Sequence, residues 1–368
     1  MRSILLAALV FAPLPVRLAA QEKKSPETKT PSASELKEVG GRTAESWIKD
    51  ISSKDPAKRT VAIQAIQQFP RSQALTALPA LVAELKRHTA ANAIDVSVRA
   101  NGLHALGAIL ADDRDLDTKL EAEAISQITR FLKDTQVAVR FRAVHALSRI
   151  GKRARPALIE LAPLLKETTA YEVRLAACHV IAQIGPDEGS AANPIVMGGL
   201  NGLVNDPSQQ VRLSALQAMT VMGPSSDALQ QTTIVKNLIT VTQKEPDAAI
   251  KVWAHMAIMG MTNDVDDDHI VPIAKLAKTD DPLVRTQVLQ ALGSVGPKAK
   301  ATFPTMMAAL DDADPNVVGA AIWAMGRLER SAAGAVPRLE LIVADAKSSD
   351  IIKKLARETL DSIQGKKK

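Results

Sequence analysis

A short residue pattern recurs along almost the whole chain at intervals of 33 to 41 residues. In its clearest copy, Val284-Arg285 is followed by Val288, Ala291 and Leu292. The arginine marks an anchor position, and the nine anchors are Arg59, Arg99, Arg140, Arg174, Arg212, Lys251, Arg285, Val318 and Lys353. A period of this length is typical of an array of helix pairs, in which each repeat packs only against its neighbours.

Each period predicts two helices joined by a tight turn. Proline opens the first helix of several repeats, where its missing N–H costs no hydrogen bond; these residues are Pro79, Pro156, Pro194, Pro272, Pro304 and Pro337. The second helix carries the anchor and often ends in glycine, as at Gly151 and Gly223. We predict an all-α protein, a right-handed α-α superhelix (a solenoid) of about nine two-helix repeats. It spans residues 44–365, between a flexible polar linker at 21–43 and a basic tail at 366–368.

The Asp-Pro turn followed by Val-Arg-x-x-Ala-x-x-Ala-Leu-Gly resembles the HEAT and HEAT-like repeat family, whose fold is armadillo-like. The resemblance implies that each anchor arginine pairs with an aspartate of the interhelix turn, in its own or a neighbouring repeat. The residues expected in this internal ladder are Arg59, Arg99, Arg140, Arg174, Arg212, Arg285, Asp206, Asp281 and Asp314. A phosphate-binding column is the alternative for the same arginines. Lys251, Val318 and Lys353 depart from the motif, and Arg59 lacks the preceding valine.

The composition favours closely packed helices over a globular enzyme. Apolar residues make up 46% of the 368 but aromatic residues only 2%, so the core must consist mainly of Ala, Leu, Val and Ile. The net charge of +6 is a mild excess, and few aromatic side chains exist for base stacking, so no nucleic-acid partner is expected. Cys178 is the only cysteine, which excludes an intrachain disulfide and a cysteine-based zinc site.

Residues 1–20 have the features of a signal peptide. A short basic start precedes an apolar stretch, Ile4–Pro13, that is too short to span a bilayer, and Ala20 is a small residue at the expected cleavage point. Arg17 is unusual so near a cleavage site, which leaves an uncleaved anchor as the alternative. No later segment is predicted to span a membrane. We therefore expect an exported bacterial protein of the periplasm or the extracellular space.

Three histidines occupy one position of the predicted second helices. His104, His145 and His179 each lie five residues after the anchor, in consecutive repeats. Anchor positions −1, +3, +6, +7 and +10 form the predicted core face, and position +5 lies about 140° from it on a helical wheel. Because second helices line the concave surface of a HEAT-like stack, we expect an outward row of imidazoles there; chance repetition of a polar position is the alternative. At about 10 Å between neighbouring helices they cannot share one metal ion.

Neighbouring outward positions complete a predicted partner-binding groove. Exposed tryptophan and arginine are the residue types that anchor protein partners. The sharpest patch places Phe141, Arg142 and Arg149 around His145. The full predicted set is His104, Phe141, Arg142, His145, Arg149, His179, Trp253, Met256, Trp323 and Arg327. Partial burial against a neighbouring repeat is the alternative for each tryptophan.

The sequence contains no recognisable catalytic or cofactor-binding motif. It lacks a nucleophile elbow, a phosphate-binding loop, a dinucleotide fingerprint and a His-Glu-x-x-His pattern. Acidic runs begin at Asp112 and Asp264, but both lack the glycine of a calcium loop and precede predicted helices, which favours helix capping. We therefore expect no catalytic residues, no cofactor and no metal site.

These observations favour a non-catalytic scaffold that holds a protein or peptide in its concave groove. Two other classes stay open. The HEAT-like resemblance extends to bilin lyases of phycobiliproteins and to a helical-repeat class of DNA glycosylases, although a cleaved signal peptide opposes both. A structural component of a cell-envelope assembly is the third possibility. The sequence identifies neither the partner nor the oligomeric state.

Overall fold

The computed structural model describes residues 37–366 apart from 89–94, 113–115, 167, 169 and 188. The predicted signal peptide, most of the predicted linker and the last two residues of the tail lie outside the described residues. Within them every regular element is a helix, and the β-type pairing is one isolated bridge between Val39 and Arg42. The predicted all-α repeat fold is therefore confirmed for this part of the chain.

The described residues contain nine second helices, one for each anchor. They are α3 (Pro56–Ile66), α6 (Val96–Ile109), α8 (Val137–Ile150), α10 (Tyr171–Ile184), α12 (Gln209–Met222), α14 (Ala248–Thr262), α16 (Pro282–Val295), α18 (Pro315–Leu328) and α20 (Asp350–Gln364). The first helices are α2 (Ala44–Ile51), α4 (Arg71–Ala74) with α5 (Leu78–Arg87), α7 (Thr118–Arg130), α9 (Leu158–Leu161), α11 (Ala192–Gly202), α13 (Ala228–Lys244), α15 (Asp267–Lys275), α17 (Phe303–Ala308) and α19 (Val336–Ala344).

Short 3-10 helices extend or join these elements: η1 (Leu75–Ala77), η3 (Phe131–Lys133), η4 (Gly151–Ala157), η5 (Ala162–Lys166), η6 (Leu203–Asn205), η7 (Leu276–Lys278), η8 (Gly296–Thr302), η9 (Ala309–Asp311) and η10 (Glu329–Ala335). Two first helices, α9 and α17, are therefore short α-helical turns between two 3-10 segments. The second helices are uninterrupted and more regular, and they carry the repeating motif.

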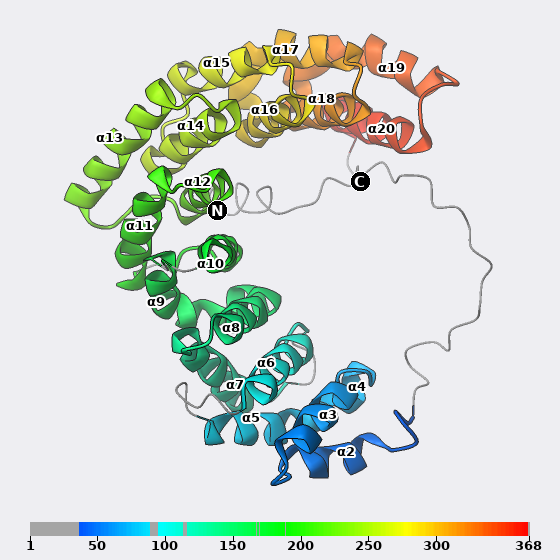
Figure 1. The fold of residues 1–368 in the computed structure, drawn as a ribbon. Helices are drawn as coiled ribbons and strands as arrows, with labels where there is room; N and C mark the ends of the chain where they lie inside the picture. Colours follow the sequence, from blue (N-terminus) through cyan, green and yellow to red (C-terminus); the bar gives the residue numbers. More distant parts are fainter. Residues whose placement is uncertain are drawn as a thin grey trace. The chain divides into compact units, whose positions relative to one another are not determined.

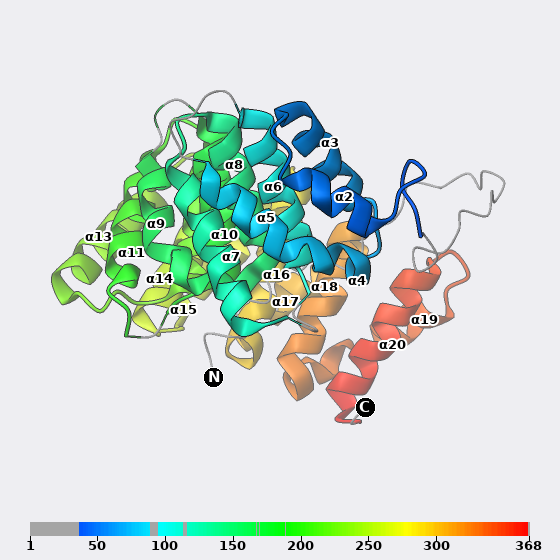
Figure 2. The ribbon, with the colours of Figure 1, turned by 90° about the horizontal axis from the view of Figure 1, so that it is seen from below.

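The described residues divide into two compact units, and the division along the sequence falls between residues 199 and 200, inside α11. In each unit the second helices form one layer and the first helices another (Figure 1). Within the N-terminal unit α3 packs on α6, α6 on α8 and α8 on α10; within the C-terminal unit α12 packs on α14, α16 on α18 and α18 on α20. Figure 2 shows the last pair, α19 and α20, side by side. We call the surface of the second-helix layer that points away from the first helices the inner face.

The predicted core face of the second helices is buried. Eight of the nine residues just before the anchors are buried aliphatic side chains: Val98, Val139, Val173, Val211, Ile250, Val284, Val317 and Ile352. Small residues let neighbouring second helices approach closely, since a Cβ atom added at Gly107 would lie 2.7 Å from Ala146 Cα. Aliphatic side chains are buried in this way between the helices of successive repeats. This burial is the main favourable contribution to the stability of such a stack.

The anchor arginines close the turn inside each repeat. In four repeats the Nη1 atom donates to the carbonyl oxygens six and five residues before the arginine. Arg59 reaches Ser53 and Lys54 at 2.8 and 3.2 Å. Arg285 reaches Thr279 and Asp280 at 3.0 and 2.9 Å, and Arg140 and Arg212 make the same pair of bonds. Because these carbonyls lie in the turn that follows the first helix, the guanidinium satisfies backbone acceptors that no regular secondary structure pairs.

A second set of bonds joins several repeats to the next one. Arg99 Nε lies 2.9 Å from Asp134 Oδ2, and Arg285 holds both oxygens of Asp312 at 2.7 and 2.8 Å. Arg212 Nη2 lies 3.6 Å from Glu245. Each of these carboxylates stands six residues before the next anchor. The hydrogen bond from Arg285 keeps the pKa of Asp312 below its usual value.

The expectation that Asp281 and Asp314 belong to the ladder is wrong. They stand four residues before the anchor, where the chain enters the second helix, and they cap it. Asp281 accepts the N–H of Leu283 at 2.8 Å, and Asp314 accepts that of Asn316 at 2.7 Å. Asp206 stands at the ladder position, and its carbonyl oxygen accepts from Arg212. The two aspartate positions are only two residues apart, so the motif alone does not separate them.

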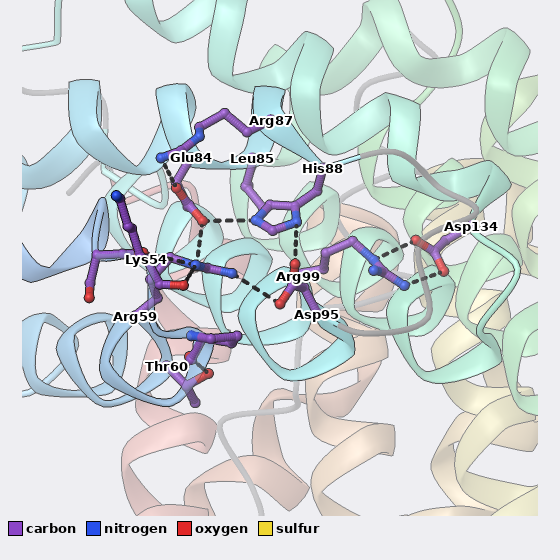
Figure 3. Close-up of polar contacts among 12 residues, drawn as sticks. Lys54, Arg59, Thr60, Glu84, Leu85, Arg87, His88, Asp95, Arg99 and Asp134 are labelled. Carbon is purple, nitrogen blue, oxygen red and sulfur yellow. Dashed lines mark hydrogen bonds and ion pairs between the residues drawn. The ribbon is translucent and has the colours of Figure 1, made fainter.

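The first repeat forms its ladder differently (Figure 3). Residue 93, six before the second anchor, is alanine and supplies no carboxylate. Arg59 instead lies between Glu84 of α5, at 2.8 Å, and Asp95, at 3.0 Å. His88 bridges the same two carboxylates, at 2.8 Å from Glu84 and 3.3 Å from Asp95, and all four side chains are buried. A buried histidine and a second acid thus replace the single aspartate used elsewhere.

A pair of histidines joins two helices of the C-terminal unit. The Nδ1 atoms of His255 in α14 and His269 in α15 lie 3.0 Å apart. Burial, the neighbouring His269 and Lys251 together lower the pKa of His255 to about 4. At neutral pH His255 is therefore uncharged in the folded protein, and one imidazole donates a single proton to the other.

Replacement of Arg99 should destabilise the N-terminal unit strongly. Arg99 and Asp134 are 0% and 1% exposed, so Arg99→Met leaves a buried carboxylate without its cation. We expect a loss of about 3–5 kcal/mol in the free energy of unfolding, measured by urea denaturation. The double variant Arg99→Met/Asp134→Asn should recover much of this loss, because no buried charge remains. A single variant within about 1 kcal/mol of the wild type would contradict the ladder assignment.

Acid should weaken the contact between α14 and α15. Because the folded pKa of His255 lies below the unfolded value of about 6.5, the unfolded chain binds the extra proton. The stability due to neutral His255 is present above about pH 6.5 and is lost as the pH falls towards 4. The wild type should therefore lose more stability than His255→Gln when the pH falls from 7 to 4. The measurement is the difference between their free energies of unfolding at each pH, which should become smaller in acid. A difference that does not vary with pH would refute this assignment.

Candidate functional site

Four basic side chains gather on the inner face of the N-terminal unit. His104 comes from α6, and Arg142, His145 and Arg149 come from α8. Together with Ala146 they line a hollow of about 100 Å³. We call His104, Arg142, His145 and Arg149 the basic cluster. Positions +2, +5 and +9 from the anchor point away from the core in α8, as the helical wheel predicts.

The basic cluster carries positive charge that no neighbouring acid offsets. All four side chains are exposed, and neither Arg142 nor Arg149 forms an ion pair with any described residue. Partial burial first, and then the two arginines, lower the pKa of His104 and that of His145. The imidazoles are therefore held neutral at pH 7, beside two permanent cations.

The surroundings of the basic cluster are neutral. Phe141 packs edge-on against His145, with ring centroids 4.5 Å apart and an interplanar angle of 75°. His179 of α10 is half-buried, and its pKa is lowered by burial and by His145. On either side, Gln64 is 3.5 Å from Asn101 Oδ1, and Ser148 donates to Gln183 at 2.6 Å. The residues that the sequence placed in one patch are thus adjacent.

Two residues predicted to line the groove are buried instead. Trp253 is 7% exposed and Met256 is 2% exposed. The expectation that they face a partner is wrong, because α14 is covered on its flanks as well as on its core face. It packs between α12 and α16, and a Cβ at Gly260 would lie 2.9 Å from the carbonyl oxygen of Thr220. A helical wheel identifies the side of a second helix that points away from the first helices. It does not show how closely the adjacent second helices approach that side.

Trp323 and Arg327 are intermediate cases. Both are half-buried, and the Trp323 ring lies on α16, where a Cβ at Gly293 would come within 2.5 Å of Trp323 Cζ3. The glycine therefore leaves the space that the ring fills. This is the partial burial against a neighbouring repeat that the sequence left open, and it limits what Trp323 can offer to a partner.

A larger hollow lies among first-helix elements of the N-terminal unit. It has a volume of about 730 Å³, and α7, η3, η4 and α9 contribute its lining. Its charged side chains already have partners: Glu121 pairs with Arg153, Lys133 pairs with Glu160 at 2.7 Å, and Arg130 donates to the carbonyl oxygens of Leu85 and His88. Sequence reasoning did not identify this hollow, because it depends on the spacing of first helices, whose sequences repeat poorly.

The acidic runs take the capping role only in part. Asp117 caps α7 by accepting the N–H of Leu120 at 2.8 Å. Asp266 precedes α15 but makes no such bond.

Among the described residues, no three His, Cys, Asp or Glu side chains are grouped so that they could hold a metal ion. None of the described helices combines the length and the apolar character that crossing a membrane requires.

Comparison with known proteins identifies the family. A model of HEAT repeats matches residues 88–182 and 270–361, together just over half of the chain. No curated protein matches. Among solved structures, the crystal structure of one engineered protein is 20% identical, with a TM-score of 0.53 over 88% of this chain and 89% of its own. A second engineered protein is 22% identical over 60% of this chain and 96% of its own, with a TM-score of 0.48. The first similarity shows the fold alone, and the family match shows that this chain belongs to the HEAT repeat family.

Proposed function

We propose that this protein is a non-catalytic scaffold that binds a protein or peptide on the inner face of its N-terminal unit. The observation that carries the proposal is the basic cluster: two exposed arginines without acidic partners, beside Phe141 and two uncharged imidazoles. Arginine and aromatic side chains are enriched where protein interfaces gain most of their affinity. Membership of the HEAT repeat family supports a binding role in general.

Rigidity of the underlying layer favours this face as a binding surface. Phe141, Arg142, His145 and Arg149 are on one helix, α8, whose opposite side is buried through Val139, Ala143 and Leu147 among others. Side chains on a packed helix keep their relative positions better than side chains on a loop, and less entropy is lost when they bind.

Replacement of Phe141, Arg142 and His145 by alanine should abolish partner binding without unfolding the chain. All three side chains lie outside the core, so we expect a change in the free energy of unfolding of less than about 1 kcal/mol. Affinity capture with the wild type, followed by mass spectrometry, identifies the partner. Its Kd should rise by at least about tenfold in the triple variant, measured by calorimetry.

A matched control tests the choice of face. Lys152, Arg155 and Ile159 are exposed residues of η4 and α9 in the same unit. Their triple alanine variant should bind the partner with wild-type affinity. Equal affinity of the inner-face variant and the wild type would show that this face is not the binding surface, and loss of binding only in the control would assign the function to the first-helix side.

We further propose that the protein is exported and acts in the periplasm or outside the cell. The support is the sequence of residues 1–20, with its apolar stretch and small residue at position 20. The mature protein should begin at Gln21. N-terminal sequencing after expression in a bacterial host tests this, with the periplasmic and cytoplasmic fractions compared. An intact Met1 in the cytoplasmic fraction would overturn the proposal and favour an intracellular role.

A further inference from the structure

We propose that the basic cluster binds carboxylate side chains, and that the partner therefore presents an acidic segment to the inner face. This inference rests on the proposed function and adds the chemistry of the partner. It also implies that the complex tightens in mild acid, because two of the four groups are histidines.

The first argument is charge matching. Ladder arginines in the first turn of other second helices have carboxylate partners, as Arg99 of α6 has Asp134 and Arg285 of α16 has Asp312. Arg142 and Arg149 have none among the described residues, although they stand close enough to lower the pKa of both His104 and His145. A bound carboxylate would replace this repulsion by attraction, and a guanidinium can bind it through two parallel N–H bonds.

The second argument is geometry. Arg142 and Arg149 are seven residues apart on α8, which places their Cα atoms about 10.5 Å apart along the helix axis. His145 lies between them, and His104 faces them from α6 across the hollow. In a segment with polyproline II conformation, which has three residues per turn and a rise of about 3.1 Å per residue, acidic residues three positions apart point to the same side about 9 Å apart, so one segment can contact both arginines.

The neutral flanks argue against a nucleic-acid partner. Phosphate backbones are followed by rows of cations and by aromatic rings available for base stacking. Here the basic cluster is bounded by the Gln64–Asn101 and Ser148–Gln183 pairs, and the adjacent ring of Phe141 already packs against His145. A short run of carboxylates fits a cluster of this length better than a continuous strand of phosphates does.

The histidines should make binding depend on pH. His104 faces Arg142, Arg149 and His145 of α8; His145 faces the same arginines and is followed by His179 of α10. Partial burial first, and then the two arginines, lower the pKa of both imidazoles in the free protein. A bound carboxylate favours their protonated form, so the complex takes up protons and its affinity rises as the pH falls below about 6.5. Glutamate, with a pKa of about 4.3, stays mostly charged at pH 5.5.

The experiment uses the full chain and a fluorescein-labelled octaglutamate peptide, with binding followed by fluorescence anisotropy at low ionic strength. Arg142→Gln and Arg149→Gln should each weaken binding by at least about fivefold. The control is Arg155→Gln, an exposed arginine of η4 that should leave the affinity within about twofold of wild type. Equal weakening by all three changes, or no binding by the wild type, would overturn the proposal.

A second arm tests the histidines. The wild-type affinity for octaglutamate should rise by at least about threefold from pH 7.5 to 5.5, whereas the double variant His104→Gln/His145→Gln should show little change. A pH response of the same size in both proteins would refute the role of the imidazoles. A labelled oligothymidylate of the same net charge serves as the nucleic-acid probe, and tighter binding of that probe than of octaglutamate would overturn the assignment of an acidic protein segment.

The two proposals can fail separately. If the captured partner is lost in the Phe141, Arg142 and His145 variant but octaglutamate does not bind, the face is correct and the carboxylate chemistry is wrong. If octaglutamate binds through Arg142 and Arg149 but partner capture is unaffected by the triple variant, the anion site stands and the proposed function fails.

Discussion

The hydrogen-bonded anchor arginine is the interaction on which the geometry of the repeats that contain it depends. One nitrogen binds two carbonyls of the turn that follows the first helix, and the rest of the guanidinium reaches a carboxylate of the next repeat, as Arg285 does with Thr279, Asp280 and Asp312. The same side chain thus sets the turn within a repeat and the register between repeats. Lysine cannot make this forked set of bonds, and valine makes none, so Lys251 and Val318 leave those steps to apolar packing.

Fixing the second helices in register also fixes what they display. Once Val139 and Ala143 of α8 are buried, Arg142, His145 and Arg149 must point outward, and His104 of α6 falls opposite them. Because the buried positions recur in every second helix, the exposed positions recur as well. Among these exposed positions, the basic cluster combines a hollow of about 100 Å³ with arginines that form no ion pair with any described residue.

Much of the fold could be predicted because burial repeats with the helix period. The core residues from Val98 to Ile352 and the helix stops at Gly151 and Gly223 follow from local pattern. Three features could not be predicted in this way. The burial of Trp253 depends on the close approach of α12 and α14. The cap role of Asp281 depends on a two-residue difference in register. The network of Glu84 and His88 depends on a contact between α5 and α3. The first and the third are decided by the spacing between helices, which a single helix does not encode, whereas the cap of Asp281 is a local bond to Leu283 that the repeat motif alone does not distinguish from a ladder contact.

Arginine has two distinct roles on one helix of this protein. On α8, Arg140 binds the carbonyls of residues 134 and 135 and belongs to the scaffold, whereas Arg142 and Arg149 lie exposed and form no ion pair with an acidic residue in the part of the chain that the structure describes. The cost of leaving like charges together is small in water but is not zero, and nothing in the packing of α8 requires it. Uncharged residues occupy the same +2 and +9 positions in other repeats, as Asn101 and Gln183 do, and would serve the fold equally well. An arrangement that the fold does not need is best explained by what it binds, and that reasoning separates the basic cluster from the ladder arginines that share its sequence motif.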